Sequence, residues 1–290
     1  MATRRPLRLL RCGDERAWFK VVDMILQFPR ALWRQRDLCW NLSEREILGR
    51  YRGSVLGLAW TVLNPLAMLV VYTFVFSQVF NARWGTLEHA GPIGFAINLF
   101  AGLIVFNLVA ESLGRAPGLV LANPNYVKKV VFPLEVLAVV NVANATFHAI
   151  ASLAVLLLFQ LVVLHALPWT TLLLPLVWLP LLIGCLAMTW ILSGLGVFIR
   201  DIGQFISVAL SMLMFLSPVF YPLSALPARY QPLLALSPLT HVIEQTRNVL
   251  VIGKPPSFAY LISGTLLTLL LCELAFRAFS RAKRAFADVL

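Results

Sequence analysis

Long apolar runs, separated by short charged or proline-containing segments, dominate the sequence after residue 52. No Lys, Arg, Asp or Glu occurs in residues 53–82, and none occurs in residues 136–199. The first run exceeds the roughly 20 apolar residues that cross a bilayer as one helix. The second run is long enough for two such helices, with a hairpin at residues 165–169, where His, Leu, Pro and Trp interrupt the pattern.

The pattern predicts an all-α, polytopic membrane protein with six transmembrane helices. The predicted spans cover residues 55–80, 95–110, 136–164, 170–199, 202–221 and 258–276. Residues 222–257 contain several prolines and are too broken to span, yet too apolar for a free loop. We interpret this segment as re-entrant outer gate helices between spans five and six, because irregular backbone at membrane depth must be covered by protein.

The segment before the first span mixes tryptophan with arginine. Trp33 and Trp40 alternate with basic residues up to Arg52, which is typical of an amphipathic helix lying in the headgroup layer. A solvated helix is the alternative, although two tryptophans are costly to leave in water. We therefore predict a cytoplasmic N-terminal region with an amphipathic interface helix (1–52), a transmembrane domain (53–279) and a cytoplasmic tail (280–290).

Composition and charge agree with this class of protein. The chain is 60% hydrophobic and 13% charged, whereas soluble domains carry about 25% charged residues. Of its 24 Lys and Arg, 20 lie on the side of the predicted topology that holds both termini, so the positive-inside rule predicts two cytoplasmic termini. The net charge of +11 is divided among segments between apolar runs and forms no single stripe, so we expect membrane lipids and no nucleic acid as partners.

Residue types that perform chemistry are scarce in the predicted spans. Glu111, Glu135 and Glu273 lie near span ends, and His148 lies within span three. For His148 a polar helix–helix contact is favoured over a proton relay. No phosphate-binding loop or HExxH motif occurs, and the four cysteines are single. We therefore expect a chain that is not an enzyme and binds no metal; a membrane-embedded glycosyl- or phosphotransferase would need acidic metal ligands.

Aromatic and methionine side chains are frequent in spans one and five. Aromatic rings offer sugar rings a rigid apolar surface while Tyr and Trp keep a polar group, so one interpretation is a channel lining. Packing or lipid-facing positions are the alternative. The channel-lining candidates are Trp60, Tyr72, Phe205, Met212, Phe215 and Tyr221.

Several short motifs together resemble a known family. The most specific is Arg45-Glu46 followed by Arg50-Tyr51-Arg52-Xaa-Ser54-Xaa-Leu56-Gly57-Xaa-Xaa-Trp60 and Asn64-Pro65-Leu66. The others, in order, are Lys128–Pro133, Arg200-Asp201-Ile202, Ser217–Pro222 and Ser237-Pro238-Leu239-Thr240, where many relatives have Asn in place of Ser237. The chain resembles type-2 ATP-binding-cassette permeases that export polysaccharides, most closely the O-antigen type of lipopolysaccharide export.

The resemblance implies a mode of action. Such permeases pair as homodimers in the bacterial inner membrane and bind two copies of a separate ATPase, which uses ATP and Mg. The permease itself binds no cofactor. A polysaccharide linked to polyprenyl pyrophosphate passes through the dimer channel. Capsule and teichoic-acid exporters are close relatives and remain the alternatives, and the residues do not identify the glycan.

Two sets of residues acquire roles from the resemblance. Arg45, Arg50, Tyr51 and Arg52 stand at the cytoplasmic side of span one and are candidates for receiving the lipid pyrophosphate; the alternative is that these arginines serve topology alone. The cytoplasmic loop after span two would contact the ATPase and transmit its motion to the permease. Its candidate coupling residues are Asn123, Pro124, Asn125, Lys128 and Lys129.

Overall fold

The computed structural model describes residues 27–75, 91–128 and 132–289. Within these residues the regular structure is helical and no strand occurs, which confirms the all-α prediction for this part of the chain. In order the α-helices are α2 (Gln27–Arg34), α3 (Arg36–Arg50), α4 (Trp60–Phe74), α5 (Gly91–Arg115), α6 (Pro124–Lys128), α7 (Glu135–Leu164), α8 (Leu174–Phe198), α9 (Ile202–Leu216), α10 (Gln231–Ala235), α11 (Pro238–Arg247), α12 (Phe258–Ala282) and α13 (Phe286–Val289).

Five helical segments in the described residues are long and apolar enough to cross a membrane. They are Gly57–Phe74, Ile93–Gly118, Glu135–Leu164, Trp169–Phe198 and Phe258–Ala285, and they correspond to five of the six predicted spans. The predicted span at 202–221 is shorter than expected, because α9 ends at Leu216. Ser217 has extended backbone angles, as the residue before a proline prefers, so α9 reaches only about 22 Å of the roughly 30 Å hydrocarbon core.

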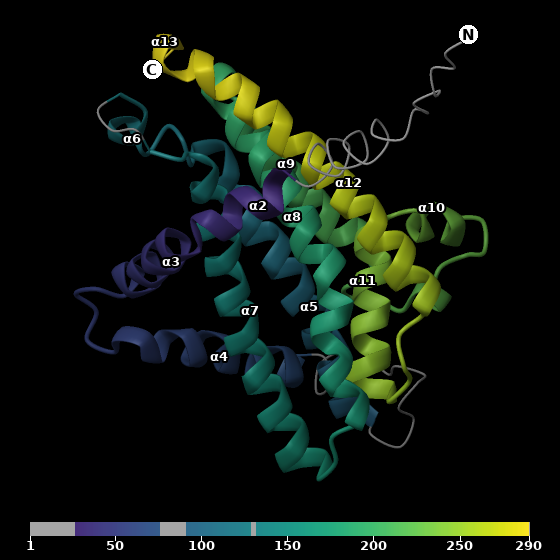
Figure 1. The fold of residues 1–290 in the computed structure, drawn as a ribbon. Coiled ribbons are helices and arrows are strands. Elements are labelled where there is room, and N and C mark those ends of the chain that lie inside the picture. The colour runs from purple at the N-terminus through teal and green to yellow at the C-terminus, as the bar shows by residue number, and fades with distance from the viewer. Residues whose placement is uncertain (1–26, 76–90, 129–131, 290) are drawn as a thin grey trace, which may run out of the picture.

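Helix α5 forms the centre of the molecule. Nearly all of its side chains between Phe95 and Val109 are buried, and it packs against α4, α7, α8, α9 and α11. Helix α5 carries apolar residues around its whole circumference, which is the pattern of a helix enclosed by others. Helix α12 packs along α8 on the outside of this bundle (Figure 1).

A second apolar cluster joins the N-terminal helix to the C-terminal end of the chain. The ring of Trp190 in α8 meets Phe28 of α2 and Phe276 of α12 edge to face. Glu273 of α12 accepts hydrogen bonds from the backbone N–H groups of Gln27 and Phe28. These amides belong to the first turn of α2 among the described residues, and the carboxylate suits the positive end of the helix dipole.

The later part of the segment between α9 and α12 is held inside the bundle by polar side chains. Helix α11 packs on α5 and α8 and continues into a π-helical turn, η7 (Asn248–Ile252). Gln160 and Thr170 donate to the carbonyls of Leu250 and Val249, at 3.1 and 2.6 Å. These bonds satisfy backbone groups that the irregular turn leaves open, as buried backbone requires.

Arg247, the last residue of α11, is a buried cation with a defined set of acceptors. Its guanidinium donates to the carbonyls of Asn98, Pro218 and Val219 at 2.6–3.0 Å, and to Glu244 at 3.1 Å. It thereby joins α5, the end of α9 and α11. A Cβ on Gly102 would lie 2.8 Å from the Nη2 atom of Arg247, so glycine at that position makes room for the guanidinium.

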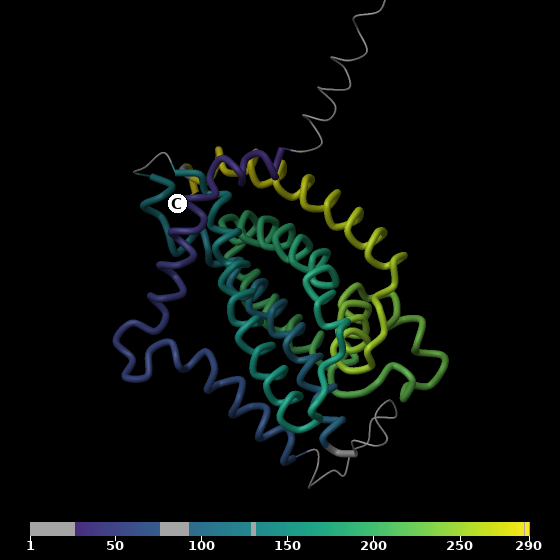
Figure 2. Tube along the Cα trace, turned by 60° about the horizontal axis from the view of Figure 1, so that its bottom comes forward, coloured from purple at the N-terminus to yellow at the C-terminus, as the bar shows by residue number. Residues whose placement is uncertain are grey.

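Helices α3 and α4 lie together on one side of the other helices. Figure 2 shows the chain leaving the bundle along α3, turning, and returning along α4. Only Leu69 of α4 is buried, and large apolar residues of α4, including Met68, Val70 and Phe74, are exposed. An apolar face of this kind requires lipid or a protein partner.

Candidate functional site

A pocket of about 680 Å³ lies between α4, α5, α7 and the end of α3. Charged and aromatic side chains line it together with apolar ones. Those with polar groups are Arg50, Tyr51, Trp60, Thr61, Asn64, Tyr72, Asn107, Glu111, Arg115, His148 and Ser152. Ionisable side chains within membrane-spanning helices mark functional sites by default, because placing them there is costly.

The turn from α3 to α4 carries Arg50 and Tyr51 into this pocket. Gly53 and Gly57 have φ angles of 86° and 50°, a left-handed backbone that glycine adopts without the clash of a Cβ. The indole N–H of Trp60 donates to the Ser54 hydroxyl at 3.1 Å and closes the turn. The spacing of Ser54, Gly57 and Trp60 in the sequence motif therefore has a local geometric reason.

Four side chains from three segments meet at the edge of the pocket. The Nη1 atom of Arg50 donates to the Glu111 carboxylate of α5. The His148 Nδ1 of α7 lies 2.9 and 3.0 Å from the two oxygens of Glu111. The Tyr51 hydroxyl lies 3.1 Å from the Nε2 atom of His148. The cluster thus joins the end of α3 to α5 and α7.

The contacts of His148 indicate its tautomer. Its Nδ1 atom faces both oxygens of a carboxylate, so Nδ1 carries a proton and donates it, while Nε2 shares a hydrogen bond with the Tyr51 hydroxyl. Nη1 of Arg50 lies 3.0 Å from the same Nδ1, since both nitrogens donate to one carboxylate oxygen. Partial burial raises the pKa of Tyr51 above its ordinary value, so its hydroxyl is neutral at physiological pH.

A second ion pair lies beside the first. Arg115, near the end of α5, pairs with Glu46 of α3, and the amide of Asn144 approaches the same carboxylate at 3.4 Å. Asn141, one turn earlier in α7, donates to the Ser112 carbonyl at 2.7 Å. Two arginines thus line the pocket, and each has a carboxylate partner.

The four residues predicted to receive a pyrophosphate are not all brought together. Arg50 and Tyr51 line the pocket, whereas Arg45 and Arg52 do not. Arg45 donates instead to the Tyr126 hydroxyl of α6 at 3.2 Å, and Arg52 is exposed. Two further residues of the cluster, Glu111 and His148, were absent from the predicted set. Their occurrence as polar residues in apolar helices was the available signal, but their proximity to Arg50 depends on the fold.

The channel-lining candidates divide into two groups. Trp60 and Tyr72 line the pocket. Phe205, Met212 and Phe215 are exposed on α9, and the Tyr221 hydroxyl donates to the Phe215 carbonyl at 2.8 Å. Within one chain, therefore, the residues of α9 and those of α4 belong to separate surfaces.

The coupling candidates lie at the end of the bundle that also holds the C-terminal helix. Pro124 opens the short helix α6 and Lys128 ends it, while Asn123 donates to the Leu119 carbonyl at 2.9 Å. Asn125 is exposed, and Lys129 lies outside the described residues. Helix α6 contacts α13 (Figure 1).

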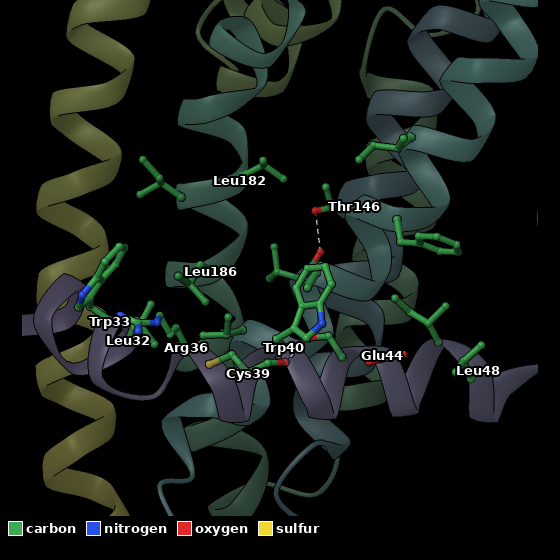
Figure 3. Close-up of a pocket in the computed structure, with 18 of the residues that line it drawn as sticks. Leu32, Trp33, Arg36, Cys39, Trp40, Glu44, Leu48, Thr146, Leu182 and Leu186 are labelled. Carbon is green, nitrogen blue, oxygen red and sulfur yellow. Dashed lines mark hydrogen bonds between the residues drawn. The ribbon is translucent and has the colours of Figure 1, made fainter.

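A second, apolar groove of about 1000 Å³ separates α2 and α3 from α7 and α8. Figure 3 shows α3 crossing below helices that carry Thr146 of α7 and Leu182 and Leu186 of α8. Trp33 and Trp40 line this groove and are 71% and 73% exposed. Two large aromatic rings so exposed beside an apolar groove suit a helix at the membrane surface.

The helical fold and the charged pocket define a multi-pass membrane protein, and comparison with known families identifies its class. Residues 37–251 match the model of the ABC-2 type transporter family, which covers most of the chain. The chain belongs to this family, as the sequence motifs predicted.

Individual relatives resemble the chain over most of its length. It is 27% identical over 266 residues to the O-antigen export system permease protein RfbA of Myxococcus xanthus, covering 91% of this chain and 99% of that protein. It is 25% identical to an RfbA protein of Klebsiella pneumoniae, covering 88% and 95%. It is 28% identical to the polysialic acid transport protein KpsM of Escherichia coli, covering 78% and 86%.

Proposed function

We propose that this chain is the transmembrane subunit of an ATP-driven exporter that moves a polysaccharide of the O-antigen type, linked to polyprenyl pyrophosphate, across a bacterial inner membrane. The observation that carries the proposal is its membership of the ABC-2 type transporter family, together with similarity to O-antigen permeases over nearly their whole length. The pocket of aromatic and cationic groups supports it, because aromatic rings suit sugars and arginine suits phosphate.

Capsule export is the second candidate, favoured by the similarity to a polysialic acid transport protein. Teichoic-acid export is a further alternative within the family. All three share the same mechanism, in which the permease is not an enzyme and binds no cofactor. ATP and Mg act in a partner ATPase, present in two copies.

The proposed assembly is a homodimer with six spans in each chain and both termini in the cytoplasm. The exposed apolar faces of α4 and α9 support pairing, since a second copy would cover part of them. Helix α9 would be the fifth span in chain order, completed by the residues that follow it. Helices α2 and α3 would lie along the cytoplasmic headgroup layer, and α10 and α11 would be re-entrant helices at the outer side.

The site that receives the lipid pyrophosphate would consist of Arg50 and Tyr51. Arg45 and Arg52 would contribute positive charge at the cytoplasmic surface. Arginine suits a pyrophosphate because its planar fork donates two parallel hydrogen bonds. Trp60, Tyr72 and, from α9, Phe205, Met212, Phe215 and Tyr221 would line the dimer channel. Residues 123–125, with Lys128 and Lys129, would pass the motion of the ATPase to the bundle.

Deletion of the gene in its host tests the proposal. We expect surface O-antigen to disappear from lipopolysaccharide gels while lipid-linked polysaccharide accumulates in the inner membrane, and a plasmid copy to restore export. Loss of capsule with intact O-antigen would favour the second candidate. Unchanged amounts of every surface polysaccharide would contradict both.

A further inference from the structure

The charged pocket contains its own anion. Glu111 accepts from Arg50 and from His148, and its side chain is 19% exposed. Arg50 lines the pocket and its side chain is 46% exposed, so it is accessible from the pocket while it contacts the carboxylate. An anionic group that enters the pocket and approaches Arg50 therefore meets a carboxylate already bound there.

The carboxylate is held in this position by more than its attraction to Arg50. His148 donates to Glu111 from α7, and the Tyr51 hydroxyl is hydrogen-bonded to the other ring nitrogen of His148. The neighbouring cation, Arg115, is likewise engaged by Glu46. No further Lys, Arg, Asp or Glu from the described residues lines the pocket.

We propose that Glu111 is the resident counter-ion of Arg50, which an incoming pyrophosphate must displace, so that Glu111 lowers the affinity of the empty site for anions. The inference rests on the proposed function, because it assumes a pyrophosphate-bearing substrate. An intramolecular partner reduces the apparent affinity of a ligand by the fraction of sites left open. If Glu111 engages Arg50 nine-tenths of the time, an anion binds about tenfold more weakly than it would to a free Arg50.

A purely structural ion pair predicts the opposite sign. If Glu111 served only to fix the end of α3 against α5 and α7, its neutralisation would loosen Arg50 and weaken anion binding. If Glu111 competes with the ligand, neutralisation strengthens binding. Glu111→Gln keeps the size and hydrogen-bonding oxygen of the side chain and removes its charge, so the variant separates the two roles.

The experiment measures binding of farnesyl pyrophosphate to the full chain with its ATPase in phosphatidylethanolamine nanodiscs, with farnesol as the uncharged control. We expect Glu111→Gln to bind farnesyl pyrophosphate about tenfold more tightly than wild type, with farnesol unchanged. In an Arg50→Gln background, the same substitution should change the Kd by less than about twofold, since the competition requires Arg50. Glu135→Gln is the matched control, because this carboxylate pairs with Lys283 outside the pocket.

Each outcome decides the matter. Equal or weaker binding by Glu111→Gln, while the wild type binds, overturns the counter-ion role and leaves the proposed function standing. A gain that persists without Arg50 also overturns it, since the effect is then a general change of charge. If farnesyl pyrophosphate binds no better than farnesol to wild type and variant alike, both the pyrophosphate specificity of the proposed function and this inference fail. Glu111→Met, equally uncharged, repeats the test if the Gln variant does not yield a folded complex.

Discussion

Arg50 and Arg52 are two residues apart but differ in what their guanidinium groups contact. Arg50 lines the charged pocket and donates to Glu111, whereas Arg52 is exposed outside it. If both arginines acted only as positive charges at a membrane surface, lysine would replace either one. A bidentate role for Arg50 predicts that they respond differently.

We expect Arg50→Lys to reduce export about tenfold and Arg52→Lys to change it by less than twofold. The measurement is the amount of surface polysaccharide in a host that lacks the native gene, at equal levels of membrane-inserted protein. Normal export by Arg50→Lys would show that Arg50 acts only through its positive charge, as a determinant of topology.

Arg247 shows that a buried cation can serve the structure of the bundle. Its replacement by Ala leaves three backbone carbonyls and Glu244 without their donor. Each bond to a charged donor contributes on the order of 1.5–3 kcal/mol, so we expect Arg247→Ala to destabilise the protein by about 3 kcal/mol or more.

Thermal unfolding of the purified chain in detergent measures this loss. Arg229→Ala is the control, because Arg229 lies over the ring of the adjacent Tyr230 in the same segment and joins no other helix in the contacts described. Equal unfolding temperatures for wild type and Arg247→Ala would show that the guanidinium is not a structural clamp.

At the scale of elements, the 3₁₀ turn η4 (Ala116–Gly118) packs closely on α8. A Cβ added to Gly196 would lie 2.2 Å from the Pro117 carbonyl oxygen, which is a backbone atom. Since backbone must shift to relieve the clash, we expect Gly196→Ala to cost about 1–3 kcal/mol of stability. Gly118→Ala is the matched control, because a Cβ there meets no atom within 4 Å; an equal effect of the two changes in thermal unfolding would contradict this packing.

The short helix α6 is the element through which ATPase motion is proposed to reach the bundle. The side-chain amide of Asn123 donates to the Leu119 carbonyl. Pro124 is the first residue of α6, and its ring restricts the backbone there. We expect glycine at positions 123, 124 and 125 to preserve membrane insertion and ATP hydrolysis while export falls severalfold, because a flexible segment transmits displacement poorly. Export at the wild-type level, measured alongside ATPase activity of the reconstituted complex, would exclude this segment as the coupling element.

At the scale of the whole molecule, the distribution of basic residues predicts which end faces the cytoplasm. In a variant without native cysteines, we expect Glu88→Cys and Pro255→Cys to react with a membrane-impermeant maleimide in intact cells. Lys128→Cys should react only after the membrane is opened, since α6 belongs to the predicted cytoplasmic side. Labelling of Lys128→Cys in intact cells would invert the proposed topology.

Much of the architecture could be predicted from the sequence, because a helix that crosses a bilayer needs a long apolar run. Each such run can be recognised on its own, without knowledge of the others. Five of the predicted spans coincide with membrane-length helices in the described residues. The length of α9 was overestimated, since hydropathy alone does not register the extended residue before Pro218. Family membership was also predictable, because the turn motif from Arg50 to Trp60 depends on local backbone geometry and a local side-chain bond.

The candidate site was determined by the tertiary structure. Sequence alone placed Arg50 and Tyr51 at the start of span one and registered Glu111 and His148 as isolated polar residues. Only the packing of α3 against α5 and α7 brings these four side chains within hydrogen-bond reach. The same holds for Arg247, which lies in the segment predicted to form outer gate helices and is buried among carbonyls of α5 and of the residues that follow α9. Apolar periodicity is a property of single helices, whereas the pairing of buried charges depends on distances between residues far apart in the chain, and those distances exist only once the helices have packed.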